Sequence, residues 1–252
     1  MSKDLAPPLR FGKHPALHDY RTLLFRDYAT ATLPAPPASF DSLPRVFDHL
    51  GISDVAELFP MDGNDTVGDC TIAALAHAIT LFRGFVAKKP SIMPAAQVLK
   101  LYYRLSGGVD SGLAELNVLN YWRQHKVSGD EILAYVSIDP KNHLHVRQAA
   151  SLFGGVYLGF QCQAHCQQEF AAKKPWTPGR LTRDGHAVLA VGYDAATLTM
   201  LTWGSTQKGT WAWWDECVDE AYAIVPPEAK KAGFAPGFNV QQLLADLNDV
   251  AD

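Results

Sequence analysis

The sequence changes character abruptly at a single cysteine. Residues 63–69 are rich in Gly, Asp and Asn, which favour turns, and Cys70 follows them directly. Residues 71–86 are mostly apolar, which predicts a largely buried helix that begins near Cys70. The free N–H groups and the positive dipole end of a helix start favour a thiolate, and a thiolate is a good nucleophile. Cys70 is therefore either a reactive thiol or a small buried residue at the start of a core helix.

The overall composition narrows the classes of function. The chain has 252 residues, 48% of them hydrophobic and 19% charged, which is enough for one large domain or two lobes with a real core. With a net charge of −4 and no basic stripe, we expect no nucleic-acid partner. No apolar run reaches membrane-spanning length, so we expect no membrane partner. Residues 1–8 lack the apolar core of a signal peptide, which predicts a cytoplasmic location and leaves export by a non-classical route open.

The four cysteines are too few for a dense disulfide framework, which suits a reducing compartment. Cys162, His165 and Cys166 lie close together in the sequence, but a structural zinc usually takes four ligands, and Cys217 has no companion. We therefore expect neither a metal nor another cofactor. We interpret these cysteines as ordinary thiols that lie at the end of a strand and in the loop after it.

The chain divides into three parts. Residues 1–45 are rich in proline and predict an extended segment that wraps the surface, and inhibition, dimerisation or simple wrapping all stay open as its role. Residues 46–228 predict the main domain, with a helical half at 46–130 and a β half at 131–228. Residues 229–252 form a tail with a short helix. A cleft between two such halves is a common place for a ligand.

Apolar patterning predicts the elements of each half. In the helical half we expect helices at residues 71–86, 95–104 and 113–125. In the β half we expect a helix at 143–152 and strands at 134–138, 154–160, 186–193, 198–204, 210–214 and 221–225. In a strand at 210–214, Trp213 and Trp214 would face opposite ways, which would expose one of them. The acidic residues that follow are interpreted as a solvated patch: Asp215, Glu216, Asp219 and Glu220.

A nucleophilic Cys70 needs a base, and His186 is the best candidate among nine histidines. It follows Gly185 at the expected start of a strand, and it belongs to the β half, so it can face Cys70 across a cleft. The alternative is a strand-end histidine bonded to a neighbouring carbonyl. His77, about two helical turns after Cys70, is expected to be a core or groove residue.

Taken together, these motifs resemble those of the papain-like cysteine peptidases. The resemblance rests on Asn64-x5-Cys70, Gly-His-Ala-Val at 185–188, Gly-Tyr at 192–193 and Trp-Gly at 203–204, in the family's order and roughly its spacing. It covers residues 45 to 225 and is closest to divergent bacterial and phage-type members with a Gly-Asp-Cys-Thr motif. It implies an α+β fold with an N-terminal helical lobe, a C-terminal antiparallel β lobe and an active-site cleft between them.

The resemblance also implies roles for individual residues. Cys70 matches the nucleophile and His186 the base, while Asn64 stands where the family has the Gln that donates to the oxyanion. Trp203 would shield the His186 side of the site. The substrate groove is expected to include the Gly-rich loop and a strand glycine: Gly108, Asp110, Ser111 and Gly155.

Two departures from the family pattern matter. Of its Cys-Gly-Ser-Cys-Trp motif only Gly68 and Cys70 remain, and Cys70 and His186 are 116 positions apart against roughly 130–150 in the papain type. The family's Asn-Ser-Trp-Gly motif aligns with residues 201–204, so Leu201 replaces the Asn that orients the base. Either another acceptor such as Thr202 or a carbonyl orients His186, or a Cys–His dyad works alone, or the site only binds.

Asp69 adds a negative charge beside Cys70. Its carboxylate would oppose thiolate formation unless it points away, and we expect it to bond to the backbone at the turn.

The sequence thus predicts a thiol hydrolase, in the first place a cysteine peptidase that forms a thioester through a Cys70–His186 dyad and acts on a peptide or protein. The alternatives are a degenerate papain-fold binding or scaffold protein, and an acyltransferase or amidase for a non-protein substrate. The oligomeric state stays open.

Overall fold

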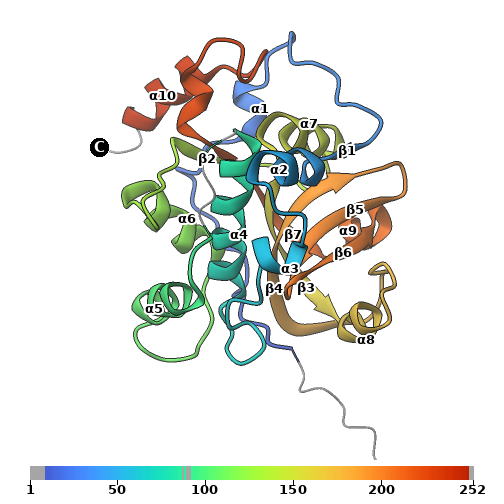
Figure 1. The fold of residues 1–252 in the computed structure, drawn as a ribbon. Helices are drawn as coiled ribbons and strands as arrows, with labels where there is room; N and C mark the ends of the chain where they lie inside the picture. Colours follow the sequence, from blue (N-terminus) through green and yellow to red (C-terminus); the bar gives the residue numbers. More distant parts are fainter. Residues whose placement is uncertain (1–8, 87, 89–91, 250–252) are drawn as a thin grey trace, which may run out of the picture.

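The structure is a computed structural model that describes residues 9–86, 88 and 92–249. The first eight residues of the N-terminal segment and the last three of the tail lie outside the described residues. The fold is α+β, with a helical half packed against an antiparallel sheet (Figure 1).

Helix α4 (Cys70–Phe85) is the centre of the helical half. Its side chains are buried except for that of Arg83, because other parts of the chain cover it on all sides. Helices α2 (Leu43–Leu50), α5 (Ala95–Leu105) and α6 (Glu115–Gln124) pack against α4, and the short α3 (Val55–Leu58) precedes it. The three helices expected from the sequence are confirmed to within two residues at each end.

The β half is one antiparallel sheet with the order β2-β7-β3-β4-β5-β6 in the described residues, and β1 also pairs with β4. Its strands are β1 (Phe40–Asp41), β2 (Ala134–Ser137), β3 (Val156–Gln163), β4 (Leu181–Tyr193), β5 (Thr197–Thr202), β6 (Ser205–Thr210) and β7 (Val218–Val225). Neighbouring residues of a strand point to opposite faces. On β4, Ala187 and Leu189 therefore join the core beneath α4, while Val188 joins the core on the other face.

Helices cover that other face. They are α7 (His143–Phe153), α8 (Cys166–Ala171) and α9 (Trp211–Cys217). The N-terminal segment carries α1 (Phe25–Tyr28), and the C-terminal part carries the 3-10 helix η1 (Pro227–Lys230) and α10 (Val240–Asp249). Helix α10 lies against α1, so the C-terminal helix packs on residues 25–28 of the N-terminal segment (Figure 1).

Two expectations for the β half are wrong. Strand β4 begins at Leu181, so His186 lies in the middle of a strand and not at its start. Residues 211–217 form helix α9 in place of a strand, because the Thr210 hydroxyl caps the helix by accepting from the Trp213 N–H at 3.0 Å. Trp213 and Trp214 are consequently both buried.

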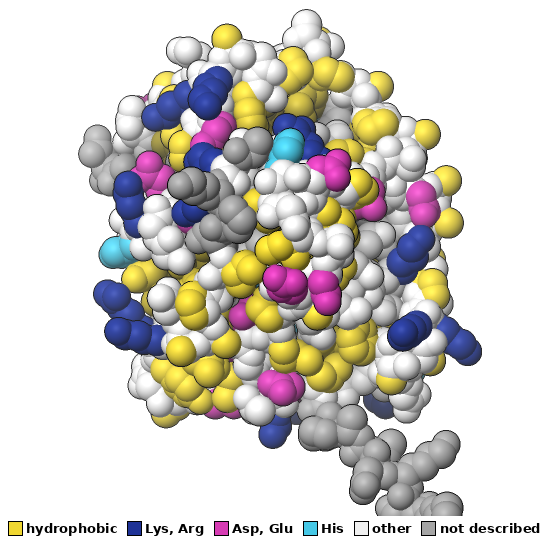
Figure 2. All heavy atoms as spheres, viewed as in Figure 1, with side chains coloured by type: hydrophobic (Ala, Val, Ile, Leu, Met, Phe, Trp, Pro, Cys, Tyr) yellow, Lys and Arg dark blue, Asp and Glu magenta, His cyan; other side chains and the backbone are white. Residues whose placement is uncertain are grey.

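The surface and the helices give two further observations. On the face shown in Figure 2, acidic, basic and apolar side chains are interspersed. Within residues 9–86, 88 and 92–249, no helix combines the length and the apolar character needed to cross a bilayer.

Candidate active site

Cys70 is the first residue of α4 and is fully buried. Burial raises the pKa of its thiol to about 12, the charge of Asp69 adds to that rise, and hydrogen bonds from the backbone N–H groups of Ala187 and Gly12 lower it. Ala187 follows His186 on β4, so the sulfur lies beside the strand that carries the candidate base. In this arrangement the thiol is neutral near pH 7.

His186 is enclosed by aromatic rings on β4. It stacks on Trp203 with 4.4 Å between ring centroids, and the edges of Phe160 and Phe11 pack against it at 5.6 and 5.7 Å. Burial lowers the pKa of its imidazole to about 3, which keeps the ring neutral. Its Nε2 is hydrogen-bonded to Thr202 Oγ1 at 2.7 Å, whereas Nδ1 has no hydrogen-bond partner within the described residues.

Leu201 does not face His186. It pairs with Leu189 and packs into the core beneath α4, which is the sheet face opposite to that of Trp203. The next residue, Thr202, supplies the hydroxyl that bonds to the imidazole. The oxygen at Nε2 is therefore one position later than the family motif indicates.

Asn64 and Asp69 lie together in the turn before α4, and both are buried. The Asn64 amide Nδ2 donates to the Val67 carbonyl at 3.2 Å. The Asp69 side chain makes no capping hydrogen bond to the first N–H groups of α4. Burial raises the pKa of Asp69 to about 8, while the Asn64 amide lowers it.

We expect Asp69→Asn to increase stability at pH 8 and to change it little at pH 4. The unfolded carboxyl releases its proton near pH 4 and the folded one near pH 8, so the folded state binds more protons in between and stability falls as pH rises through that window. The amide has no proton to release, so a difference of about four pKa units leaves the variant about 5 kcal/mol more stable at pH 8. Urea unfolding at both pH values measures this difference.

Asp65→Asn is the matched control, because Asp65 is exposed in the same turn. A stability gain for Asp69→Asn that is equal at pH 4 and pH 8 would contradict the buried, protonated carboxyl.

The loop at residues 106–112 borders the site on the helical side. Asp110 accepts from the Gly68 N–H at 2.9 Å and from the Tyr102 hydroxyl at 2.5 Å, which ties this loop to the turn before Cys70. Ser111 reaches the N-terminal segment, because its carbonyl is hydrogen-bonded to His14 Nε2 at 2.6 Å. Gly108 is exposed, with no side chain or backbone near the place of a Cβ.

Gly155 lies away from this groove. It packs against Leu81 in the core, while Phe160, five residues further along β3, stands opposite His186. At about 3.3 Å per residue, that offset is far too long for Gly155 to touch a group bound at Cys70. The expectation for this residue is therefore wrong, and Gly159, which pairs with Ala187, is the β3 glycine beside the site.

The N-terminal segment occupies the cleft between the two halves. The N–H groups of Gly12 and Lys13 donate to the Gly185 carbonyl at 3.2 and 3.0 Å on the β side. On the helical side, the Leu113 N–H donates to the Gly12 carbonyl at 2.8 Å and the His14 N–H donates to the Leu113 carbonyl at 2.9 Å. A Cβ at Gly12 would overlap the Gly68 carbonyl oxygen, so only glycine fits this place. The segment seals Cys70 and His186 from solvent.

Inhibition is one of the roles that the sequence leaves open for residues 1–45, but no local pattern marks residues 9–14 as the part that fills the cleft. Residues 9–14 carry no periodic pattern. The residues that they contact in the cleft, Gly68, Leu113 and Gly185, lie far away in the sequence. Residues 215–220 are also only in part the solvated patch that we expected. Glu220 is buried and paired with Lys13, whereas Asp215 and Glu216 are exposed.

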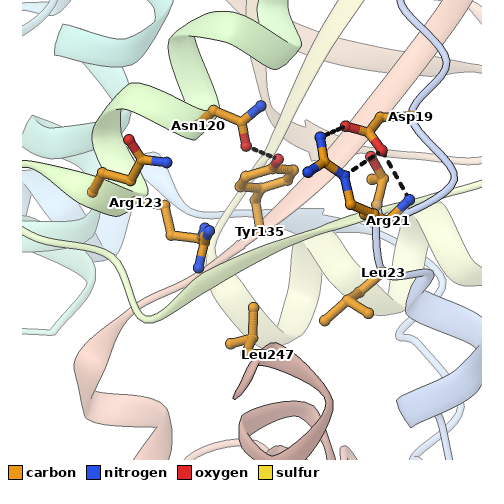
Figure 3. A pocket seen from close by; sticks show the side chains of 9 residues that line it. Asp19, Arg21, Leu23, Asn120, Arg123, Tyr135 and Leu247 are labelled. Atoms are coloured by element: carbon orange, nitrogen blue, oxygen red, sulfur yellow. Dashed lines mark hydrogen bonds and ion pairs between the residues drawn. The ribbon is translucent and has the colours of Figure 1, made fainter. Parts of the chain in front are cut away.

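A second hollow lies elsewhere, between the N-terminal segment, α6, β2 and α10 (Figure 3). Arg21 is paired there with Asp19 at 2.7 Å, and the Tyr135 hydroxyl donates to Asn120 at 2.5 Å. Neither Cys70 nor His186 lines this hollow. Arg21 and Asp19 neutralise each other, and the hollow lacks the candidate nucleophile and base, so it does not compete with the cleft as the candidate site.

Comparisons with known proteins place the fold. No protein-family model matches the sequence, and no curated protein matches it. The structure is similar to that of xylellain, a cysteine protease from Xylella fastidiosa, with 17% identity over 90% of this chain and 99% of that one and a TM-score of 0.64. It is also similar to procathepsin B from Trypanosoma congolense, with 13% identity over 86% of each chain and a TM-score of 0.57. Procathepsin L 3 from Tenebrio molitor is 11% identical over 87% of this chain and 76% of that one, with a TM-score of 0.57. The chain has a papain-like fold.

Proposed function

We propose that this protein is a cysteine-type hydrolase, in the first place a peptidase, with Cys70 as nucleophile and His186 as base. The observation that carries the proposal is the arrangement at the junction of α4 and β4. The Cys70 sulfur accepts from the N–H of Ala187, the residue after His186, and the Thr202 hydroxyl holds Nε2 of the imidazole. If Nε2 carries the proton of that bond, the unpartnered Nδ1 is free to accept the thiol proton.

The reaction uses these groups twice. Cys70 Sγ forms a bond to the carbonyl carbon of the substrate while its proton passes to His186 Nδ1. That proton then goes to the leaving nitrogen as the C–N bond breaks, which leaves a thioester on Cys70. Water attacks the thioester, gives one proton to His186 and displaces the sulfur, which regains its proton. The Cys70 N–H and the Asn64 amide are the proposed donors to the oxyanion.

The proposal requires the N-terminal segment to leave the cleft. Gly12 lies beside the Cys70 sulfur, where a substrate carbonyl would sit, and Phe11 packs on the His186 ring. The form seen here is therefore a closed resting state. The thiol and the imidazole are both neutral in this form because the segment buries them and excludes water.

Incubation with a mixed peptide pool, and with an ester and an amine acceptor, tests the reaction class. Peptidase activity gives new carboxylate ends, which take up ¹⁸O from labelled water and are read by mass spectrometry. Transfer of acyl groups to the amine, with no peptide cleavage, would instead show the acyltransferase. No product from any substrate, in a chain whose segment has been displaced, would show the binding protein.

We expect Thr202→Val to slow turnover by about ten- to a hundredfold, with a smaller effect on KM. The valine keeps the shape but leaves the buried Nε2 without a partner, which costs roughly 1–3 kcal/mol and releases the ring orientation. Steady-state kinetics on a cleaved peptide measure kcat and KM separately, and Thr202→Ser should restore most of the activity. Thr199→Val, a half-buried position in the same strand, is the control. An unchanged kcat in Thr202→Val would remove Thr202 from the mechanism.

A further inference from the structure

The side chain of Lys13 leaves the cleft and enters the protein interior. Its exposed fraction is 1%, which is rare for a lysine. The ammonium is paired with Asp219 Oδ2 and with Glu220 Oε1, both at 2.9 Å, and donates to the His14 carbonyl at 3.1 Å. A buried charge persists only with such partners, so the surroundings of Lys13 are built to hold a cation.

A third carboxyl group faces the same space. Glu115, the first residue of α6, is fully buried, and neither of its oxygens has a hydrogen-bond partner within the described residues. Burial raises the pKa of Glu115 well above its ordinary value, Glu220 adds to that rise, and Lys13 opposes it. Burial likewise opposes the charge of Lys13, yet Glu220, Glu115 and Asp219 together raise its pKa. The acids offer more acceptor atoms than one ammonium uses.

The space itself exists because residue 159 is glycine. A Cβ at Gly159 would overlap the Lys13 side chain and would lie 2.9 Å from Glu115 Oε1. Gly159 stands in β3 between Glu220 of β7 and Ala187 of β4. The pocket is thus one strand away from the N–H that bonds to the Cys70 sulfur, and the residue before Lys13 lies beside that sulfur.

The structure assigns to Glu115, Glu220, Asp219 and Gly159 the role of a specificity pocket that takes a lysine or arginine side chain of the substrate, one residue away from the attacked carbonyl. Lys13 holds the place of that side chain in the closed chain. This assignment rests on the proposed function, because it names the substrate class of the same site. A peptide in the cleft can use the hydrogen bonds that Leu113 and Gly185 now make to residues 12–14.

Labelling by peptide ketone electrophiles tests the selectivity. Three tripeptide acyloxymethyl ketones differ only at the second residue from the reactive carbonyl, which is lysine, norleucine or alanine. In the full-length protein we expect the lysine probe to label Cys70 about tenfold or more faster than the norleucine probe, which has the same length without the charge. Glu115→Gln and Glu220→Gln should bring that ratio towards one. Gly159→Val should slow the lysine and norleucine probes relative to the alanine probe, because the valine fills the pocket.

Glu216→Gln, an exposed acid on the preceding helix, is the control and should keep the ratio. Equal rates for lysine and norleucine in the unmodified protein would overturn the pocket and leave the proposed function standing. If none of the probes labels, even after the segment has been displaced, the proposed function fails and the assignment of a substrate pocket fails with it.

A binding measurement examines the pocket without turnover. Lys13→Ala empties it, and n-propylammonium then replaces the missing part of the side chain, with 1-propanol as the uncharged match. We expect n-propylammonium to raise the Tm of the full-length variant by about 2–4 °C more than it raises that of the unmodified protein, and 1-propanol to have no such effect. Equal effects of the two compounds would overturn a pocket that selects cations, whatever the outcome of the labelling.

Discussion

Cys70→Ala is expected to abolish covalent labelling by an electrophilic peptide and all hydrolysis of peptides. The alanine keeps the start of α4 and removes the sulfur atom that is proposed to bond to the carbonyl carbon. We expect the residual rate to be at least about 10⁴-fold lower, the scale seen when a covalent nucleophile is lost. Mass spectrometry of the intact protein, after reaction with a peptide ketone, measures the labelled fraction directly.

Cys217→Ala is the matched control, because Cys217 is buried and burial raises its thiol pKa to about 12, as for Cys70. It should label at the unmodified rate. Equal labelling of Cys70→Ala and the unmodified chain would place the reaction on another residue and remove the proposed nucleophile. Titration of the thiol in the closed chain does not separate enzyme from binding protein, since the raised pKa of Cys70 reflects its burial beneath the segment.

The helical half could be predicted because its signals are local. The turn residues before Cys70 and the apolar run after it fix the start of α4 whatever covers them later. His186 could be selected for a similar reason, since small and β-branched residues mark its strand. The papain-like arrangement then followed from the order of these segments.

The partner of His186 could not be placed in the same way. A motif alignment puts Leu201 at the position of the orienting residue, but a shift of one residue in a strand turns every side chain to the other face. The pairing of β4 with β5 has such an irregularity between Ala190 and Gly192, and Thr202 is the residue that reaches the imidazole. The register of a sheet depends on pairings that a single sequence does not show.

The run at residues 210–214 shows why a short apolar segment is hard to assign from sequence alone. Its apolar residues fit both a strand and a buried helix over so short a length. The cap by Thr210 was the signal for a helix, and it was legible in the sequence because a threonine before an apolar run is a common helix start. The occupant of the cleft left no such signal, since its contacts to Gly68, Leu113 and Gly185 are all long-range.

Gly12→Val is expected to raise the rate of thiol modification at pH 7 by about a thousandfold. The valine side chain would overlap the Gly68 carbonyl, which forces residues 9–14 out of the cleft and lets water reach Cys70 and His186. Burial is the largest cause of both pKa shifts, so the thiol pKa returns from about 12 towards 9 and the imidazole pKa from about 3 towards 6.5. A fall of three units in the thiol pKa increases the thiolate fraction at pH 7 about a thousandfold.

The rate of reaction with iodoacetamide between pH 5 and 10 measures this shift, with the labelled residue identified by mass spectrometry. In the unmodified chain the rate should rise about tenfold per pH unit across the whole range, because every point lies below the thiol pKa. In Gly12→Val the rise should end near pH 9, or lower if His186 gains a proton and forms an ion pair with the thiolate. Tyr20→Ala changes a 97% exposed side chain of the same segment and should follow the unmodified profile. If the pH profiles of Gly12→Val and the unmodified chain coincide, the segment does not control the reactivity of Cys70. A circular dichroism spectrum that shows Gly12→Val to be folded is needed for this comparison.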